Sequence, residues 1–181
     1  RLIGAEAGHV VMGDTLSIKV YQALASALEL NPHRKVVLTD SGNFPSDIYM
    51  AEGLLKSLGK DYELRVVAPE DVRKNITEEI AVTMLTEVDY RTARLHDMKA
   101  VTARAHAKGA LTIWDLAHSA GATPVQLEAC GADFALGCTY KYLNGGPGAP
   151  AFLYVKPELQ DKVQPPLSGW WGHASPFAFD L

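Results

Sequence analysis

Residues 110–140, with the sequence ALTIWDLAHSAGATPVQLEACGADFALGCTY, decide the fold class of this chain. Two short apolar runs, at residues 110–117 and 133–140, are typical of strands, and the helical pattern PVQLEACG lies between them. A strand, a helix and a second strand in this order predict a unit whose two strands lie parallel.

The same alternation extends in both directions from this unit. Further strands are expected at residues 9–13, 35–40, 62–68, 81–88 and 149–155, and further helices at residues 14–28, 46–59 and 95–109. In the helix at residues 14–28, Ile18, Tyr21, Ala25 and Leu28 fall on one face. The sequence therefore predicts an α/β fold, a mostly parallel sheet with helices on both faces in three αβα layers.

Length and composition exclude several classes of protein. The 181 residues are enough for one domain, and the net charge of -4 comes without a basic block that could follow a phosphate backbone. The two cysteines, Cys130 and Cys138, have neither the spacing of a metal site nor the density of a disulfide scaffold. No apolar run approaches the roughly 20 residues of a membrane helix. We expect a soluble, cytoplasmic protein that binds neither nucleic acid nor metal. Because the sequence starts and stops without the usual end patterns, we also expect it to be part of a longer chain.

Polar side chains follow four of the predicted strands, at the sheet edge where ligands of parallel sheets bind. They occur in GDTLS at residues 13–17, in SGNFPSD at residues 41–47, in the pair Asp115 and His118, and in the pair Tyr140 and Lys141. We expect these groups to face one crevice.

The segment GDTLS stands at the start of a predicted helix, whose unpaired N–H groups and positive dipole end can hold a phosphate. The alternative is ordinary capping of that helix by Asp14, Thr15 or Ser17. The chain has no Walker-type loop and no G-x-G-x-x-G, so the pattern argues against a nucleotide cofactor.

Three residues at the other strand ends each allow two interpretations. Asp115 either caps the turn that follows its strand or pairs with a cationic group in the site, and His118 is either structural or a ligand contact. Lys141 is either an ordinary surface lysine or, at the end of a buried strand, an amine that attacks carbonyl groups. A lysine with a cofactor-facing aspartate is the pair that pyridoxal phosphate needs, for its Schiff base and for its protonated ring nitrogen.

The stretch WDLAHSAGATPVQLEACGADFALGCTYKYLNGGPGAPAFLYV resembles the core of the aminotransferase class V group of fold-type I pyridoxal phosphate enzymes, and within it the kynureninase family. The resemblance is carried by Asp115, by His118 three residues later, by Lys141 in TYKYLNGGPG, and by LSGWWGH at residues 167–173. It runs from residue 8 to residue 173. Members of that family are considerably longer than this chain.

The resemblance implies a set of contacts to the cofactor ring, which come from Phe44, Pro45, Ser46, Asp47, Thr86, Asp115, His118 and Lys141. Phe44 would stack on the pyridine ring, within a loop formed by residues 44–47. Asp115 would pair with the ring nitrogen, His118 would lie beside the ring, and Lys141 would form the Schiff base.

A second set of implied residues concerns the cofactor phosphate and the substrate. Leu16 and Ser17 would bind the phosphate, although the family often has threonine at the second place. Tyr140 would bind the phosphate and relay protons. Trp170 would reach a phosphate across a homodimer interface, and His173 would contact the substrate.

The implied activity is hydrolysis of a carbon–carbon bond of L-kynurenine to anthranilate and L-alanine, and the 3-hydroxy derivative of L-kynurenine is a further candidate substrate. The catalytic residues would be Lys141, Tyr140 and Asp115. The reaction would belong to tryptophan catabolism through the kynurenine pathway and to NAD biosynthesis. Residues 1–181 would form the large cofactor-binding domain, and a small C-terminal domain would lie outside them.

Three alternatives stay open at this point. A cysteine desulfurase or an aminotransferase of the same class would share Asp115 and Lys141, but Cys138 is a poor desulfurase cysteine because it is expected to be buried. A non-catalytic binding subunit with the same fold is the second alternative. A nucleotide-binding sheet domain would need the glycine fingerprint that is missing here.

Overall fold

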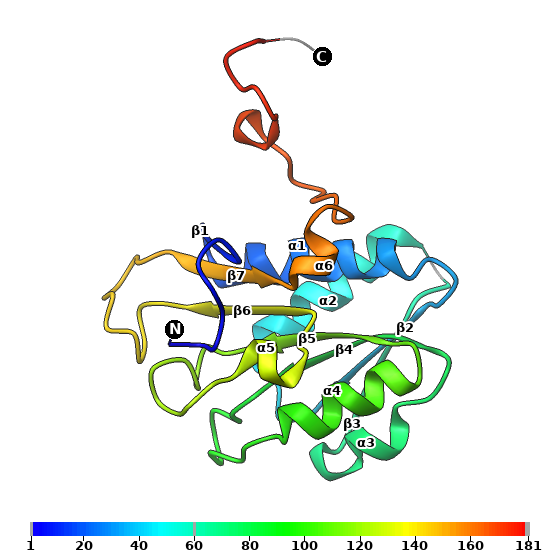
Figure 1. Cartoon of the computed structure of the whole chain (residues 1–181). Coiled ribbons are helices and arrows are strands. Elements are labelled where there is room, and N and C mark those ends of the chain that lie inside the picture. Colours follow the sequence, from blue (N-terminus) through cyan, green and yellow to red (C-terminus); the bar gives the residue numbers. More distant parts are fainter. Residues whose placement is uncertain (1, 60, 180–181) are drawn as a thin grey trace.

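One sheet of seven strands forms the centre of this computed structural model, which describes residues 2–59 and 61–179 (Figure 1). The strands are β1 (Val10–Gly13), β2 (Val36–Asp40), β3 (Glu63–Val67), β4 (Ile80–Thr86), β5 (Leu111–Asp115), β6 (Phe134–Cys138) and β7 (Ala151–Val155). They lie in the order β1-β7-β6-β5-β4-β2-β3. Strand β7 pairs antiparallel with β6 and β1, and the other neighbours pair parallel. The prediction of a mostly parallel sheet is confirmed.

Helices cover both faces of this sheet. Helices α1 (Leu16–Leu30) and α2 (Pro45–Leu58) pack on one face, and α3 (Val72–Asn75), α4 (Met98–Ala107) and α5 (Leu127–Cys130) pack on the other (Figure 1). Shorter elements are the 3-10 turns η1 (Pro69–Asp71) and η2 (Trp170–Gly172) and the helix α6 (Pro157–Gln160). The predicted three-layer α/β arrangement is confirmed. Within the described ranges, no helix combines the length and the apolar character needed to cross a bilayer.

Strand β5 shows why its sequence is apolar at successive positions. Ile113 packs into the core under α1 and α2, whereas the next residue, Trp114, packs into the core under α4. The buried indole nitrogen of Trp114 donates a hydrogen bond to Thr102 Oγ1 at 3.1 Å. A strand that is buried on both sides has no polar face, which explains the continuous apolar pattern.

Helix α1 buries a different face from the one marked by Ile18, Tyr21, Ala25 and Leu28. Of those four residues only Leu28 is buried, and Ile18 is 37% exposed. The residues that pack on the sheet are Val20, Ala23, Leu24 and Ala27, together with Leu28. The helix is apolar around most of its circumference, so periodicity alone marks two possible faces, and the position of the sheet decides between them.

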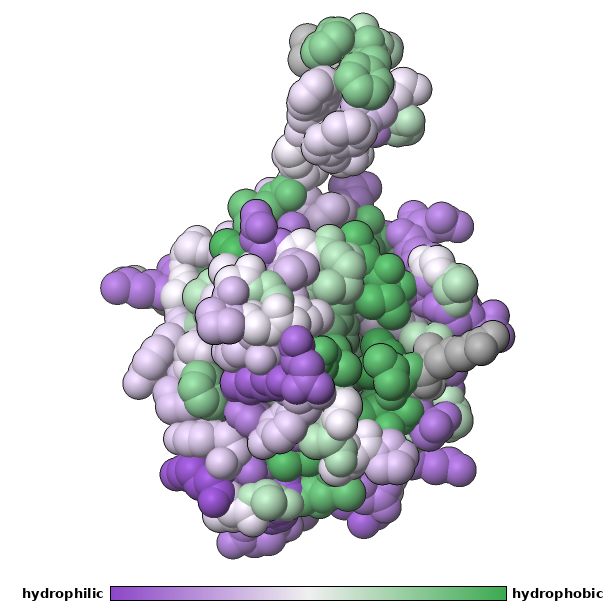
Figure 2. Space-filling model, turned by 90° about the vertical axis from the view of Figure 1, so that its left-hand side faces the viewer, coloured by the Kyte–Doolittle hydropathy of each residue, from purple (hydrophilic) through white to green (hydrophobic). Residues whose placement is uncertain are grey.

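The C-terminal segment, defined here as residues 164–179, extends away from the body of the molecule (Figure 1). Figure 2 shows that it carries hydrophobic residues at its far end. Trp170 packs against Trp171, Phe177 and Phe179, with ring centroids 5.5 to 5.8 Å apart. All four side chains remain more than half exposed. Clustered aromatic residues with so much exposed surface indicate a contact region.

Gly121 allows the loop after β5 to pack under the loop after β6. Its φ is +87°, and an added Cβ would lie 2.5 Å from the carbonyl oxygen of Tyr142. We expect Gly121→Ala to lower the free energy of unfolding by roughly 2–4 kcal/mol, because it adds left-handed strain and a main-chain overlap. Urea denaturation of the full-length protein measures this change.

Gly53→Ala is the matched control for this prediction. Gly53 lies in α2, and an added Cβ there has no atom within 4 Å. That substitution should raise the free energy of unfolding by up to about 1 kcal/mol, because alanine favours the helix. A Gly121→Ala protein as stable as the wild type would show that the two loops are not in fixed contact.

Candidate active site

The polar residues that follow the strands gather around one cavity of about 430 Å³ at the carboxyl ends of β5 and β6. The lining residues are Asp14, Thr15, Leu16, Ser17, Phe44, Ser46, Asp115, Ala117, His118, Cys138, Tyr140, Lys141, Gly148, Ala149, Pro150 and Ala151. All four strand-end segments that the sequence singled out contribute to it. The structure therefore brings these segments together, as the strand-end argument predicts.

The amine of Lys141 lies at the centre of the polar contacts in this cavity. Its Nζ is 2.9 Å from His118 Nε2 and 5.1 Å from the centre of the Phe44 ring. Burial, and then the positive charge of Lys141, lower the pKa of His118 below its usual value. The imidazole is therefore neutral at pH 7, which suits a hydrogen bond to the amine.

Asp115 has one carboxylate oxygen in use and one without a partner. Its Oδ1 accepts a hydrogen bond from the N–H of Ala117 at 2.9 Å, whereas Oδ2 is buried and has no hydrogen-bond partner among the described residues. Burial raises the pKa of Asp115 to about 6, although the hydrogen bond and Lys141 oppose the shift. The two interpretations of this residue are thus compatible: Oδ1 caps the turn, and Oδ2 is available to a cationic N–H group.

A second buried carboxyl group, that of Asp47, lies next to Asp115. Asp47 is in the first turn of α2, and neither of its oxygens has a partner among the described residues. Burial and then the charge of Asp115 raise the pKa of Asp47 well above its usual value. Two neighbouring carboxyl groups in a buried site resist ionising together, so this part of the cavity favours a positively charged group.

The start of helix α1 carries a partial positive charge, in contrast to the two buried carboxyl groups. Thr15 is the N-cap residue, and its Oγ1 accepts a hydrogen bond from the N–H of Ile18 at 3.4 Å. Leu16 and Ser17, in the first turn, line the cavity. A 15-residue helix directs its positive end toward this side of the cavity, where an anionic group would be stabilised.

Phe44 and His118 line the cavity, and the ring of Tyr90 contacts both of them without lining it. Phe44 lies 5.0 Å from Tyr90 and 5.9 Å from His118, measured between ring centroids, and Tyr90 lies 6.1 Å from His118. Tyr90 is not among the residues predicted from the sequence. Its position shortly after the carboxyl end of β4 is the signal that could have found it, since residues after four other strands were assigned to the site on that basis.

Three residues of the predicted set lie near the cavity without lining it. Pro45 occupies the first turn of α2 beside Phe44, and Asp47 lies behind the lining residues. Thr86 is buried, and its Oγ1 donates a hydrogen bond to the carbonyl oxygen of Val88 at 3.2 Å. In the single chain, the Thr86 hydroxyl therefore stabilises the loop that follows β4.

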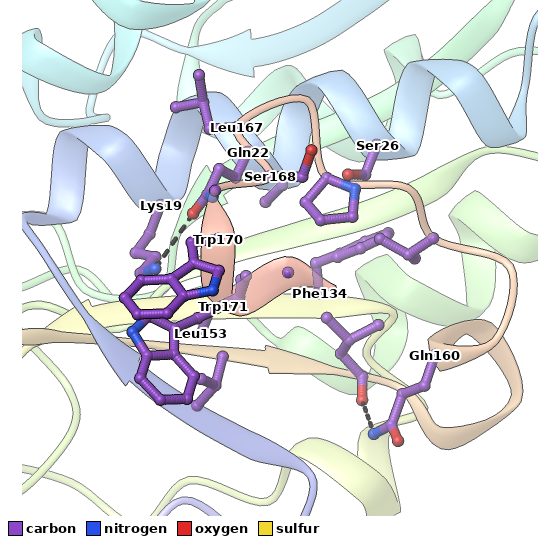
Figure 3. A pocket seen from close by; sticks show the side chains of 17 residues that line it. Lys19, Gln22, Ser26, Phe134, Leu153, Gln160, Leu167, Ser168, Trp170 and Trp171 are labelled. Carbon is purple, nitrogen blue, oxygen red and sulfur yellow. Dashed lines mark hydrogen bonds between the residues drawn. The ribbon is translucent and has the colours of Figure 1, made fainter. Parts of the chain in front are cut away.

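Trp170 and His173 lie in the C-terminal segment, outside this cavity. Trp170 lines a second, more apolar cavity of about 530 Å³ between α1, β7 and the segment (Figure 3). In Figure 3 its ring lies near Trp171 and Lys19. The Nδ1 atom of His173 accepts a hydrogen bond from the N–H of Ser175 at 3.0 Å. One chain alone does not bring these two residues to Lys141.

The raised pKa of Asp115 predicts a dependence of stability on pH in the cofactor-free protein. The folded state retains protons that the unfolded chain releases above its ordinary pKa of 3.8, so the free energy of unfolding falls as the pH rises from about 4 to about 7. Over this pH range, the free energy of unfolding of the wild type should fall by about 3 kcal/mol relative to that of Asp115→Asn, which is the pKa shift expressed as a free energy. Urea denaturation of both proteins at several pH values measures the difference. Parallel stability profiles would contradict the assignment.

Several known proteins are similar to this chain in sequence. Residues 12–173 match the family described as aminotransferase class-V. The chain is 53% identical to a kynureninase from Pseudomonas fluorescens, over 99% of this chain and 44% of that protein. It is 54% identical to a kynureninase from Deinococcus radiodurans, over 97% of this chain and 42% of that protein. The chain thus spans less than half of the length of these curated relatives.

Solved structures share the fold at lower sequence identity. A cysteine desulfurase from Thermococcus onnurineus NA1 superposes with a TM-score of 0.74 at 22% identity, over 93% of this chain and 43% of that one. The ureidoglycine-glyoxylate aminotransferase from Bacillus subtilis gives 0.70 at 20% identity, over 88% of this chain and 42% of that one. Together with the family match over most of the sequence, these likenesses agree with the observed sheet and helices. The chain belongs to the aminotransferase class-V family.

Proposed function

We propose that the protein is a pyridoxal phosphate-dependent hydrolase that cleaves L-kynurenine with water into anthranilate and L-alanine. The observation that carries the proposal is the placement of the Lys141 amine and the unpartnered Asp115 Oδ2 at one cavity. Support for the substrate comes from the two relatives named kynureninase, which match nearly the whole chain at more than half identity. The proposal places the reaction in tryptophan catabolism and NAD biosynthesis.

The residues around the cavity fit pyridoxal phosphate at three points. The buried Oδ2 of Asp115 lacks a partner that a protonated ring nitrogen would supply. The ring of Phe44 offers a flat apolar wall, 5.1 Å from the Lys141 amine. Leu16 and Ser17 offer the first turn of α1 to a phosphate, and Tyr140 adds a phenol to the lining.

When bound, the cofactor supplies an electron sink that is conjugated with the α-carbon of the substrate. The Lys141 amine would hold the cofactor and then take the proton from that α-carbon as a general base. Asp115 would keep the ring nitrogen protonated through Oδ2, and His118 would orient the amine through its 2.9 Å contact.

The later half of the reaction needs an acid and a water molecule. Water adds to the γ-carbonyl of the substrate, the bond between the β- and γ-carbons breaks, and the β-carbon takes up a proton. Tyr140 is the proposed acid, because it lines the cavity beside Lys141 and its phenol is protonated. Burial, and then Cys138, raise the pKa of Tyr140 above its usual value.

A cysteine desulfurase is the runner-up within the same fold. That activity needs an exposed, easily ionised cysteine. Cys138 lines the cavity, but it is buried, and burial raises the pKa of its thiol. Burial also raises the pKa of Cys130, which lies outside the cavity lining. Neither cysteine suits sulfur transfer, so the hydrolase is preferred.

We also propose a cytoplasmic homodimer with shared active sites, in which Trp170 reaches the cofactor phosphate of the partner and His173 contacts substrate. The exposed aromatic cluster of the C-terminal segment supports this arrangement, because such a surface needs a partner. Two free cysteines support a reducing compartment. Residues 1–181 would then be the large domain, and carboxylate recognition would come from a smaller domain elsewhere in the protein.

Lys141 is expected to be the lysine that binds the cofactor. Borohydride reduction of the loaded full-length protein, followed by peptide mapping, should place the pyridoxyl label on Lys141. Lys141→Ala should slow release of anthranilate by roughly 10²–10⁴-fold, the contribution of a general base. Lys74→Ala is the control, because Lys74 is exposed and paired with Asp71. A label on another lysine, or unchanged turnover in Lys141→Ala, would refute the assignment.

Shared active sites predict complementation between two impaired variants. A dimer of one Lys141→Ala chain and one Trp170→Ala chain contains one site with both native residues. In the proposed dimer, each site takes Lys141 from one subunit and Trp170 from the other. Random exchange makes half of the dimers mixed, and one of the two sites in each mixed dimer is intact, so activity should rise to about a quarter of the wild-type value. Sedimentation should show a dimer for each variant. No gain in activity on mixing would show that Trp170 does not act across an interface.

A further inference from the structure

The Phe44 wall of the cavity depends on a short loop, residues 41–43, between β2 and α2. The loop is held by main-chain and side-chain hydrogen bonds: the N–H of Ser41 donates to the carbonyl oxygen of Val67 at 2.9 Å, and the N–H of Gly42 donates to Asp40 Oδ1 at 2.7 Å. Asn43 then accepts a hydrogen bond from the N–H of Phe44 at 2.7 Å. The position of the Phe44 ring therefore follows from the position of Asp40.

Asp40 is fixed in turn by a histidine from another part of the chain. Its Oδ2 lies 2.7 Å from His96 Nε2, and both side chains are buried. His96 precedes α4, its N–H donates to the carbonyl oxygen of Glu87 at 2.9 Å, and its ring meets Trp114 at 6.3 Å. The pair thus links the loop before α2 to the layer of helices on the opposite face of the sheet.

Gly42 shows how tightly this loop is held. A Cβ at Gly42 would lie 2.7 Å from Asp89 Oδ2 and 3.0 Å from Asp40 Oδ1, so the loop passes between two carboxylates. Asp89 accepts hydrogen bonds from the N–H groups of Arg91 and Thr92. Asp40 has His96 as its side-chain donor, and a buried carboxylate without such a donor is strongly destabilising.

We propose that the Asp40–His96 pair is a positioning device that sets the Phe44 ring against the cofactor cavity. Neither residue lines the cavity, so both act through the loop at residues 41–43. The effect on the cofactor rests on the proposed function, whereas the effect on the loop does not. Loss of the hydrogen bond should loosen Phe44 and weaken cofactor retention, since a small misplacement in a binding wall has a large effect.

The test uses two substitutions that both remove the imidazole ring. In His96→Gln, the side-chain amide nitrogen can reach the place of Nε2 and restore the bond to Asp40. In His96→Asn, the shorter side chain places its amide near the Nδ1 position and cannot reach. The two proteins are therefore matched in polarity and differ in the one hydrogen bond.

A second histidine–aspartate pair provides a control for general loss of stability. His106 Nε2 lies 2.8 Å from Asp133 Oδ2, just before β6 and so at the opposite end of the sheet from the cavity. The same Asp133 oxygen accepts a hydrogen bond from the N–H of Thr112 at 2.8 Å. His106→Asn should increase amide exchange at Thr112 and leave the loop at residues 41–43 unchanged.

The first measurement is amide hydrogen exchange in the cofactor-free full-length protein. His96→Asn should speed exchange of residues 41–44 by at least about tenfold and leave Thr112 protected, with His96→Gln within about threefold of the wild type. The second measurement is the dissociation rate of pyridoxal phosphate and the visible circular dichroism of the bound cofactor. We expect dissociation to be roughly tenfold faster in His96→Asn and nearly normal in His96→Gln.

Each outcome has one meaning. Unchanged exchange of residues 41–44 in a folded His96→Asn protein overturns the proposal, as does equal loss in His96→Gln and His96→Asn. If His96→Asn does not fold, the double variant Asp40→Asn/His96→Leu replaces it, because asparagine keeps the acceptor for Gly42 and leucine cannot bond the asparagine amide, and the same exchange criterion applies. A wild-type protein that binds no pyridoxal phosphate overturns the proposed function, while the exchange rates still decide whether the pair positions the loop.

Discussion

The buried, half-satisfied carboxylate of Asp115 is the constraint around which the site is arranged. One oxygen accepts a hydrogen bond from the N–H of Ala117, and the other is buried beside a second carboxyl group, Asp47. An arrangement of this kind is unfavourable for a protein that only needs to fold. The two neighbouring carboxyl groups, at the end of β5 and the start of α2, fix a place where a positive charge would be stabilised.

The sequence predicted the sheet and the cavity lining because both follow from local patterns. Strands such as β5 are apolar on both faces, and the polar residues at their carboxyl ends must meet at one edge of a parallel sheet, as Asp115, His118 and Lys141 do. The resemblance to a known family then added roles that no spacing could supply. Contacts to a cofactor and to a second subunit stay predictions.

Other features depend on contacts between distant segments, and local patterns could not predict them. The buried face of α1 was ambiguous because the helix is apolar nearly all round, and only the sheet selects Val20, Ala23 and Ala27. Tyr90 reaches the ring of Phe44 through a loop whose path depends on Asp89. The bond between Asp40 and His96 joins residues 56 positions apart, and nothing in either local segment indicates the other.

The glycine-rich turn between β6 and β7 has two parts, one next to Lys141 and one farther out. The part next to Lys141 is closed by hydrogen bonds, from the N–H of Gly145 to the carbonyl oxygen of Thr139 and from the N–H of Asn144 to that of Lys141. The outer part has one such bond, from the N–H of Ala149 to the carbonyl oxygen of Gly146 at 3.1 Å, and its residues Gly146 and Gly148 have left-handed φ angles of +79° and +81° with open space beside them. Changes in length at this outer part would reshape the mouth of the cavity and leave the amine in place. A related chain with a different outer turn can therefore accept a different ligand while its lysine amine keeps the same position.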